Sequence, residues 1–295
     1  MKLFLTFTFG ALAASFSMAN PVFLEASDFN VFVRNGFSGQ NSDVQGRLAA
    51  GGNFTVQNYG IGDHLAGFTG DSLIVGGEFS FSNGQVFNGN VVTADTTPSA
   101  PGMNILNGTM HSGTSPSIII PTLMTELVAR SGYIGSLSAN GTTNFSFGSL
   151  NLSGGTGTTR IYNVTAAQLS AANSFTIDAP AGTTAVVNIS GANASFQNAG
   201  FSLTGGLTSN KVLLNFWDAK TLSMSGVGVF GSIFAPQADV SFSNGQLNGQ
   251  LIANSFSGNG EMHISAFDGT VPVPEPASFM ILAIGGLGLL ARRRK

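Results

Sequence analysis

The sequence predicts a mainly β chain folded as a β-solenoid, with one α-helix on its flank and a short apolar helix near its carboxyl end. Two near-repeats carry this prediction. Gly51–Val56 matches Gly76–Phe81 at a shift of 25 residues, and Gly231–Ala235 matches Gly249–Ala253 at a shift of 18. Shifts of this size suit one coil of a solenoid, which holds a few short strands separated by turns. A β-sandwich with short strands is the alternative.

A further repeat, at a larger separation in sequence, supports the predicted strands and turns. Ser80–Gln85 recurs almost unchanged as Ser241–Gln246, and apolar residues alternate with polar ones in both segments. Each copy contains an Asn-Gly pair, and both of these residues tolerate the positive φ of tight turns. The 40 glycines and 43% hydrophobic residues favour a turn-rich β protein over a disordered chain.

The amino end has the features of an export signal. Residues 1–19 combine a cationic start, an apolar stretch and a small-x-small cleavage site at Ser17–Ala19. We expect a cut between Ala19 and Asn20, which leaves residues 20–270 as one exported β domain.

One segment breaks the strand pattern. Residues 121–138 carry apolar side chains at spacings of three, four and seven, which predicts an amphipathic helix. We expect this helix to pack along the flank of the solenoid and to shield an edge. Residues 96–116, rich in Pro, Gly, Ser and Thr, are expected to form a surface loop. The strands before and after the helix, about 29–94 and 145–267, are expected to form one joined stack.

The carboxyl end carries a tail in three parts, over residues 271–295. A proline-rich boundary precedes the apolar residues 279–291, and a cationic stop follows that we expect to remain cytoplasmic. At ~1.5 Å rise per residue, this apolar run is shorter than the roughly 30 Å hydrocarbon core, so it predicts a marginal transmembrane helix. The boundary comprises Val273, Pro274, Glu275, Pro276, Ala277 and Ser278, and the stop comprises Arg292, Arg293, Arg294 and Lys295.

This tail resembles the PEP-CTERM protein-sorting signal, because Pro274-Glu275-Pro276, the apolar run and the arginine cluster occur in that order at the chain end. The resemblance covers about residues 272–295. It implies a Gram-negative bacterium that makes exopolysaccharide, and recognition by an exosortase in the inner membrane. Transient anchoring, cleavage near Pro274–Pro276 and delivery to the cell surface or extracellular matrix would follow. Without the resemblance, an ordinary single-pass tail anchor would explain the segment equally well.

The exported domain resembles the choice-of-anchor A family over nearly all of residues 28–268. The segments that carry the resemblance are Phe29–Phe32, Asp43–Asn53, Asp178–Pro180, Val187–Gly191, Asn215–Trp217, Gly231–Pro236 and the turn Asn244–Gln246. The family is similar in pattern to discontinuous β-solenoids with a flanking helix, such as bacterial ice-binding proteins. It brings no catalytic residues to carry over.

Charge and motif content argue against several classes of function. Residues 20–270 hold six cations against thirteen acids, which disfavours nucleic-acid binding. The chain has no cysteine, so thiolate chemistry is excluded. His64, His111 and His263 are not at metal-ligand spacing, and the acid beside an imidazole, Asp63, sits in a glycine-rich loop. We therefore predict no catalytic residue, no metal site and no cofactor.

These observations predict a non-catalytic surface or matrix protein associated with exopolysaccharide and biofilm, whose hydroxyl- and amide-rich surface hydrogen-bonds to polysaccharide. One alternative is a polysaccharide-processing enzyme, which needs carboxylates and a cation converging in one groove. Another is an ice-binding protein, which needs a regular array of threonines. Pairs such as Thr142-Thr143 direct adjacent side chains to opposite faces, so the sequence predicts no threonine ladder. Trp217, the sole tryptophan, is expected to anchor the core.

Overall fold

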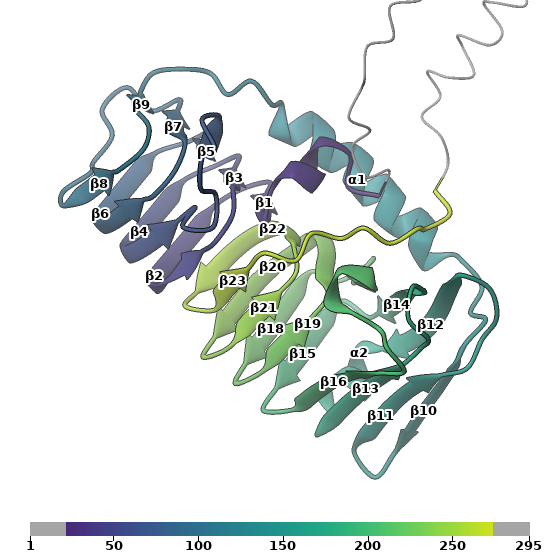
Figure 1. Ribbon diagram of the computed structural model, residues 1–295. Coiled ribbons are helices and arrows are strands. Elements are labelled where there is room, and N and C mark those ends of the chain that lie inside the picture. Colours follow the sequence, from purple (N-terminus) through teal and green to yellow (C-terminus); the bar gives the residue numbers. More distant parts are fainter. Residues whose placement is uncertain (1–21, 274–295) are drawn as a thin grey trace, which may run out of the picture.

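The computed structural model describes residues 22–273 and confirms the predicted β-solenoid (Figure 1). The predicted signal peptide, its cleavage position, the transmembrane helix and the cationic stop lie outside the described residues. Within residues 22–273, none of the helices combines the length and the apolar character needed to cross a membrane.

The chain forms two half-solenoids linked by a helix. The first half begins near the middle of the stack and coils outward to one end, the helix α1 (Ile120–Gly135) crosses to the other end, and the second half coils back to the middle (Figure 1). The first half contains η1 (Leu24–Asp28), β1 (Val31–Val33), β2 (Phe37–Val44), β3 (Leu48–Ala50), β4 (Phe54–Ile61), β5 (Asp71–Val75), β6 (Phe79–Val86), β7 (Asn90–Thr93), β8 (Met103–Ile105) and β9 (Met110–His111).

The second half is longer and opens with a hairpin. Its elements are β10 (Thr142–Ser146), β11 (Ser149–Ser153), β12 (Thr159–Thr165), α2 (Ala166–Ser170), β13 (Ser174–Asp178), β14 (Thr184–Ser190), β15 (Asn193–Gln197), β16 (Gly200–Thr204), η2 (Ser209–Lys211), β17 (Val212–Asn215), β18 (Thr221–Ser225), β19 (Gly228–Phe230), β20 (Ser232–Ser243), β21 (Gln246–Asn248), β22 (Leu251–Gly258) and β23 (Glu261–His263). The β10–β11 pair is antiparallel, whereas coil-to-coil pairs such as β4–β6 and β14–β17 are parallel.

The sequence repeats set the register between coils. Phe54 pairs with Phe79 at the predicted shift of 25, and Ile233 pairs with Leu251 at the predicted shift of 18. Parallel in-register pairing places like side chains above one another. The rings of Phe54 and Phe79 stack with centroids 5.4 Å apart. The core is therefore a continuous column of apolar side chains along the axis.

The sheet under α1 is buried on both faces. It contains β1, β3, β5, β12, β14, β17 and the first parts of β20 and β22, and its inward residues line the solenoid core. Its outward residues, such as Phe32, Phe234 and Ile252, form a second apolar cluster with Leu127 and Ile134 of α1. The helix thus covers the face of a sheet, whereas the sequence led us to expect that it would shield an edge.

Three sequence expectations need correction. The helix ends at Gly135 instead of residue 138, at the point where the chain passes Trp217. A Cβ on Gly135 would lie 2.4 Å from the indole, so a larger residue does not fit there. Trp217, which we expected to anchor the core, is half-buried. The expected loop at 96–116 contains β8 and β9, which add a further coil to the first half.

The first and last coils of the chain pair with each other, and we call the contact of β1 and β2 with β22 the seam. Val31 pairs with Leu251, and Phe37 pairs with Phe256. The rings of Phe37 and Phe256 stack with centroids 4.8 Å apart. The predicted joined stack is thereby confirmed, although the strands that meet are more than 200 residues apart in sequence.

We expect Phe37→Ala to lower the free energy of unfolding by about 3–5 kcal/mol, because the ring is 1% exposed and touches aromatic rings on both sides of the seam. Urea unfolding measures the change. The neighbouring exposed Ser38→Ala serves as the control, with an expected change within about 0.5 kcal/mol. A loss below about 1 kcal/mol for Phe37→Ala would contradict tight packing at the seam.

Candidate functional site

A column of hydroxyl side chains runs along the sheet formed by β15, β18, the second part of β20 and β22, and the first part of β2, β4 and β6. Each member pairs in register with the next, and the column crosses the seam from Ser257 to Ser38. Neighbouring strands lie about 4.7–4.9 Å apart, so the hydroxyl groups repeat at that spacing. The column consists of Ser195, Ser223, Ser241, Ser257, Ser38, Thr55, Ser80 and Ser99.

The alternation of each strand separates this column from the core. The residues before and after Thr55 on β4, Phe54 and Val56, point inward and are buried, whereas Thr55 is exposed. A second outward column is also uncharged and consists of Gln197, Ser225, Ser243, Gln40, Gln57 and Ser82. We call the surface made by these two columns the hydroxyl face.

Asparagines in the left-handed conformation turn the chain at the border of this face. Asn41, Asn58 and Asn83 have φ values of 51°, 52° and 57°. Asparagine adopts this region more readily than other residues with a Cβ. The Asn58 Nδ2 atom donates a hydrogen bond of 2.8 Å to Asn41 Oδ1, which links successive corners. The predicted Asn-Gly turns at Asn83 and Asn244 (φ 53°) are confirmed.

A polar groove of about 580 Å³ lies at this corner, beside the hydroxyl face. Phe242 pairs with Gly258 and Gln246 pairs with Glu261, so the corner from Gly258 to Glu261 is one residue shorter than its neighbour. The shorter corner leaves a recess between coils. Its lining residues are Asn41, Gly226, Val227, Gly228, Asn244, Gly245, Gln246, Asn259 and Glu261.

Titratable side chains gather on the sheet next to this groove. Asp43 and Glu261 lie on β2 and β23, which pair directly. His263 Nε2 is 3.3 Å from the Glu261 carboxylate, and His64 Nδ1 is 3.1 Å from that of Asp63. Burial raises the pKa of Asp43, and the negative charges of Asp63 and Glu261 raise it further, while His263 and His64 oppose the shift.

This cluster contributes one residue to the lining of the groove. Glu261 is the one charged residue among those that line it, and the His263 imidazole lies 3.3 Å from its carboxylate. Within residues 22–273, no group of three or more His, Asp or Glu side chains is arranged to hold a metal ion.

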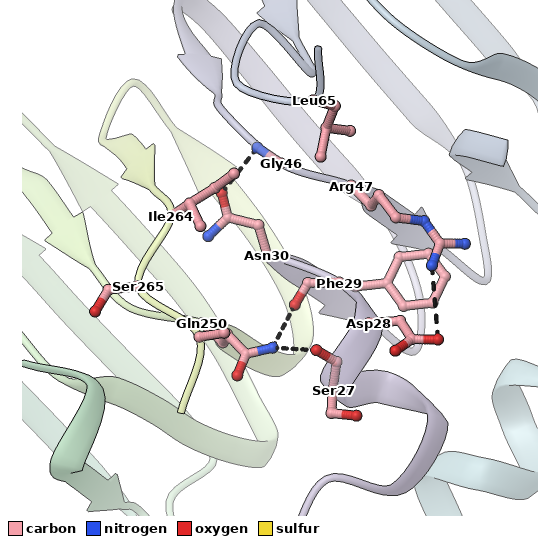
Figure 2. Close-up of a pocket in the computed structure, with 11 residues that line it drawn as sticks. Ser27, Asp28, Phe29, Asn30, Gly46, Arg47, Leu65, Gln250, Ile264 and Ser265 are labelled. Atoms are coloured by element: carbon pink, nitrogen blue, oxygen red, sulfur yellow. Dashed lines mark hydrogen bonds and ion pairs between the residues drawn. The ribbon is translucent and has the colours of Figure 1, made fainter. Parts of the chain in front are cut away.

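A cavity of about 150 Å³ lies at the seam beside η1 (Figure 2). The Arg47 guanidinium stands 4.2 Å from the centre of the Phe29 ring and 3.7 Å from the Asp28 carboxylate. The Gln250 side-chain amide donates hydrogen bonds to the carbonyls of Ser27 (2.9 Å) and Phe29 (2.7 Å). These polar groups are engaged with one another, so the cavity belongs to the packing of the seam.

The sequence predicted a hydroxyl-rich surface but not the ordered columns of the hydroxyl face. A search for threonine ladders overlooks serines, and the members of the column come from coils of unequal length. The signal was nevertheless present, because the echo of Ser80–Gln85 in Ser241–Gln246 places both serines at the same position of their coils.

Comparisons with known proteins identify two segments. Residues 22–264 match the family described as "Putative Ice-binding-like adhesive domain", and residues 272–295 match the PEP-CTERM protein-sorting motif. The predicted sorting motif is therefore found at the carboxyl end, and it implies an exported protein of the cell surface or extracellular space. No curated protein matches the sequence.

Several solved structures are similar to the chain. An ice-binding protein from the Antarctic ascomycete Antarctomyces psychrotrophicus shares 15% identity over 85% of this chain and 97% of that chain, with a TM-score of 0.42. A glycosylated ice-binding protein from an Arctic yeast shares 16% identity over 89% and 99%, with a TM-score of 0.43. An ice-binding protein from an Antarctic biological consortium shares 13% identity over 86% and 94%, with a TM-score of 0.40.

We expect Asp43→Asn to stabilise the protein at neutral pH. A raised carboxyl pKa means that the folded state binds the proton more tightly than the unfolded state, so the contribution of Asp43 is favourable below its unfolded pKa and is lost as pH rises through its folded value. The advantage of the variant should therefore be present at pH 7 and should shrink toward pH 3.5. Thermal unfolding of both proteins across this range measures it. A stability gain of Asp43→Asn that grows as the pH falls would contradict a raised pKa for Asp43.

Proposed function

The chain belongs to the family of ice-binding-like adhesive domains, and from this membership we propose that it is a non-catalytic adhesive protein of the bacterial cell surface or extracellular matrix. Its hydroxyl face is the proposed contact surface, and its proposed ligand is a neutral polysaccharide of the exopolysaccharide that surrounds the cell. The observation that carries the proposal is the uncharged hydroxyl column, which continues across both halves of the solenoid.

The chemistry of the face fits a polymer that itself presents hydroxyl groups. Serine hydroxyls both donate and accept hydrogen bonds, and Gln and Asn amides do the same through separate atoms. One weak contact per coil, repeated along the axis, adds up to strong attachment when the ligand also repeats. Because the two columns carry no charge, salt should not screen the attachment.

Delivery to the surface is the second part of the proposal. We propose that a signal peptide, residues 1–19, is cut between Ala19 and Asn20, and that an exosortase in the inner membrane of a Gram-negative bacterium cleaves near Pro274–Pro276. Residues 20–270 would then be the mature adhesive domain, and the apolar residues 279–291 would anchor it only in transit. The resemblance to choice-of-anchor A proteins fits this route.

Ice adsorption is a second candidate function, because the hydroxyl face presents the regular outward array that the sequence lacked as a threonine ladder. The column contains Thr55 as its one threonine and otherwise serines, which offer hydroxyls without methyl groups. This composition favours a hydrated polymer over a surface recognised partly through methyl burial.

We expect the double variant Thr55→Lys/Ser241→Lys to lose most binding to two probes, the isolated exopolysaccharide of the host and microcrystalline cellulose. Both positions are exposed members of the hydroxyl column, so lysine side chains would hold the polymer away without disturbing the core. Sedimentation of the protein with the insoluble polymer measures binding. Binding of the unaltered protein should change little between low and high salt.

The matched control is Ser112→Lys/Thr122→Lys, which makes the same chemical change at exposed positions away from the hydroxyl face. It should bind as the unaltered protein does. Equal loss in both double variants, or no binding of the unaltered protein to either polymer, would contradict an adhesive hydroxyl face. Thermal hysteresis that is abolished by Thr55→Lys/Ser241→Lys would favour ice instead.

The delivery route is tested by the mature carboxyl terminus. Mass spectrometry of the protein recovered from the cell surface should find a terminus near Pro274–Pro276. A variant with Pro274, Glu275 and Pro276 replaced by alanine should instead keep its tail and stay in the inner-membrane fraction. An intact tail on the unaltered surface protein would contradict exosortase cleavage without bearing on the adhesive face.

A further inference from the structure

The end of the second half-solenoid has an open strand edge. β10 pairs with β11 and lies at the border of its four-stranded sheet, in the order β10-β11-β13-β16. Ser146 and Ser149 flank the two-residue turn and exchange backbone hydrogen bonds across it. Thr143 and Phe145 therefore direct their backbone N–H and C=O groups to the open side, where the described chain provides no paired strand.

This edge lacks the features that usually prevent strand pairing. Natural edges are blunted by charged residues, proline, bulges or very short strands. β10 is five residues long and its pairing with β11 is regular. No charged residue and no proline occurs between Arg130 and Arg160 in the sequence.

The opposite end of the molecule provides a contrast. Its last strands, β8 and β9, are three and two residues long. Strands this short give little area for pairing with another chain. The two ends of the solenoid are thus unlike, and only the β10 end offers a full strand.

The turn at this edge exposes an aromatic ring. Phe147, at the tip of the β10–β11 hairpin, is 103% exposed and has a φ of 48°. A residue with a Cβ rarely adopts this conformation, and a bulky one does so at a cost. The hairpin therefore holds a phenylalanine fully in solvent at the border of an unpaired strand.

We propose that β10 is a self-association edge, where a second copy of this chain adds its own β10 in antiparallel orientation about a two-fold axis. The sequence of β10 is complementary to itself in this antiparallel orientation. With Asn144 at the centre, Thr142 faces Ser146 of the second copy, and Thr143 faces Phe145 of the second copy. Hydroxyl pairs and pairs of aromatic with β-branched residues are favourable across strands. Because the edge is uncharged, two copies do not repel.

The same pairing brings the exposed ring close to the second copy. Phe147 follows Ser146 in the turn, so in this register it lies beside the end of the second copy's β10, next to Gly141. The four-stranded sheets of the two copies would join into one, and the hydroxyl faces would lie on one elongated particle. The inference goes beyond the adhesive function and does not depend on it.

The absence of cysteine from the chain allows a direct test in the full-length exported protein. In the two-fold pairing, residue 144 opposes its own copy at a Cα separation of roughly 4.5–5.5 Å, within the range for a disulfide. We expect Asn144→Cys to form a disulfide-linked dimer on mild oxidation. The matched control Asn104→Cys, an exposed asparagine on the short strand β8, should remain a monomer.

A second variant keeps the test independent of disulfide geometry. Asn144→Lys places two lysines opposite each other across the two-fold axis. In sedimentation, this variant should dimerise with severalfold weaker affinity than the unaltered protein, whereas Asn104→Lys should dimerise as the unaltered protein does. Equal cross-linking at positions 144 and 104 would overturn the proposal, as would a monomeric unaltered protein at the highest concentration reached. A dimer that survives Asn144→Lys would place the contact elsewhere.

Discussion

The seam is the contact on which the rest of this structure depends. It joins strands that are more than 200 residues apart, through parallel pairing of β1 and β2 with β22 and through the stacked rings of Phe37 and Phe256. Buried amides set its register, since Gln250 bonds to the carbonyls of Ser27 and Phe29. Burial of rings supplies most of the favourable free energy, whereas unsatisfied amides would be costly, so one register is favoured.

The function that we propose follows from that register. Without the seam, the serines of the second half and the hydroxyls of the first would be two short arrays on separate coils. With it, Ser257 and Ser38 are neighbours and the hydroxyl column runs through both halves. Each contact with a ligand is small, so continuity matters more than any single side chain.

Local repetition made much of the fold predictable. The shifts of 25 and 18 gave the pairing of Phe54 with Phe79 and of Ile233 with Leu251, and the apolar spacing gave the helix. Features that depend on distant contacts were not predictable. No local sequence pattern indicates that Phe37 pairs with Phe256. Nor does one indicate that Gly135, at the end of α1, lies against Trp217, which is over 80 residues away in sequence.

Hydrogen–deuterium exchange with and without bound exopolysaccharide tests the central claim most directly, because it reports which backbone amides become protected. We expect added protection in β4, β18 and the second part of β20, along the hydroxyl face, with little change in α1, which packs on the sheet that contains β14 and β17 (Figure 1). Protection concentrated in α1, or spread evenly over all strands, would contradict the claim that the hydroxyl face is the surface that holds the polymer.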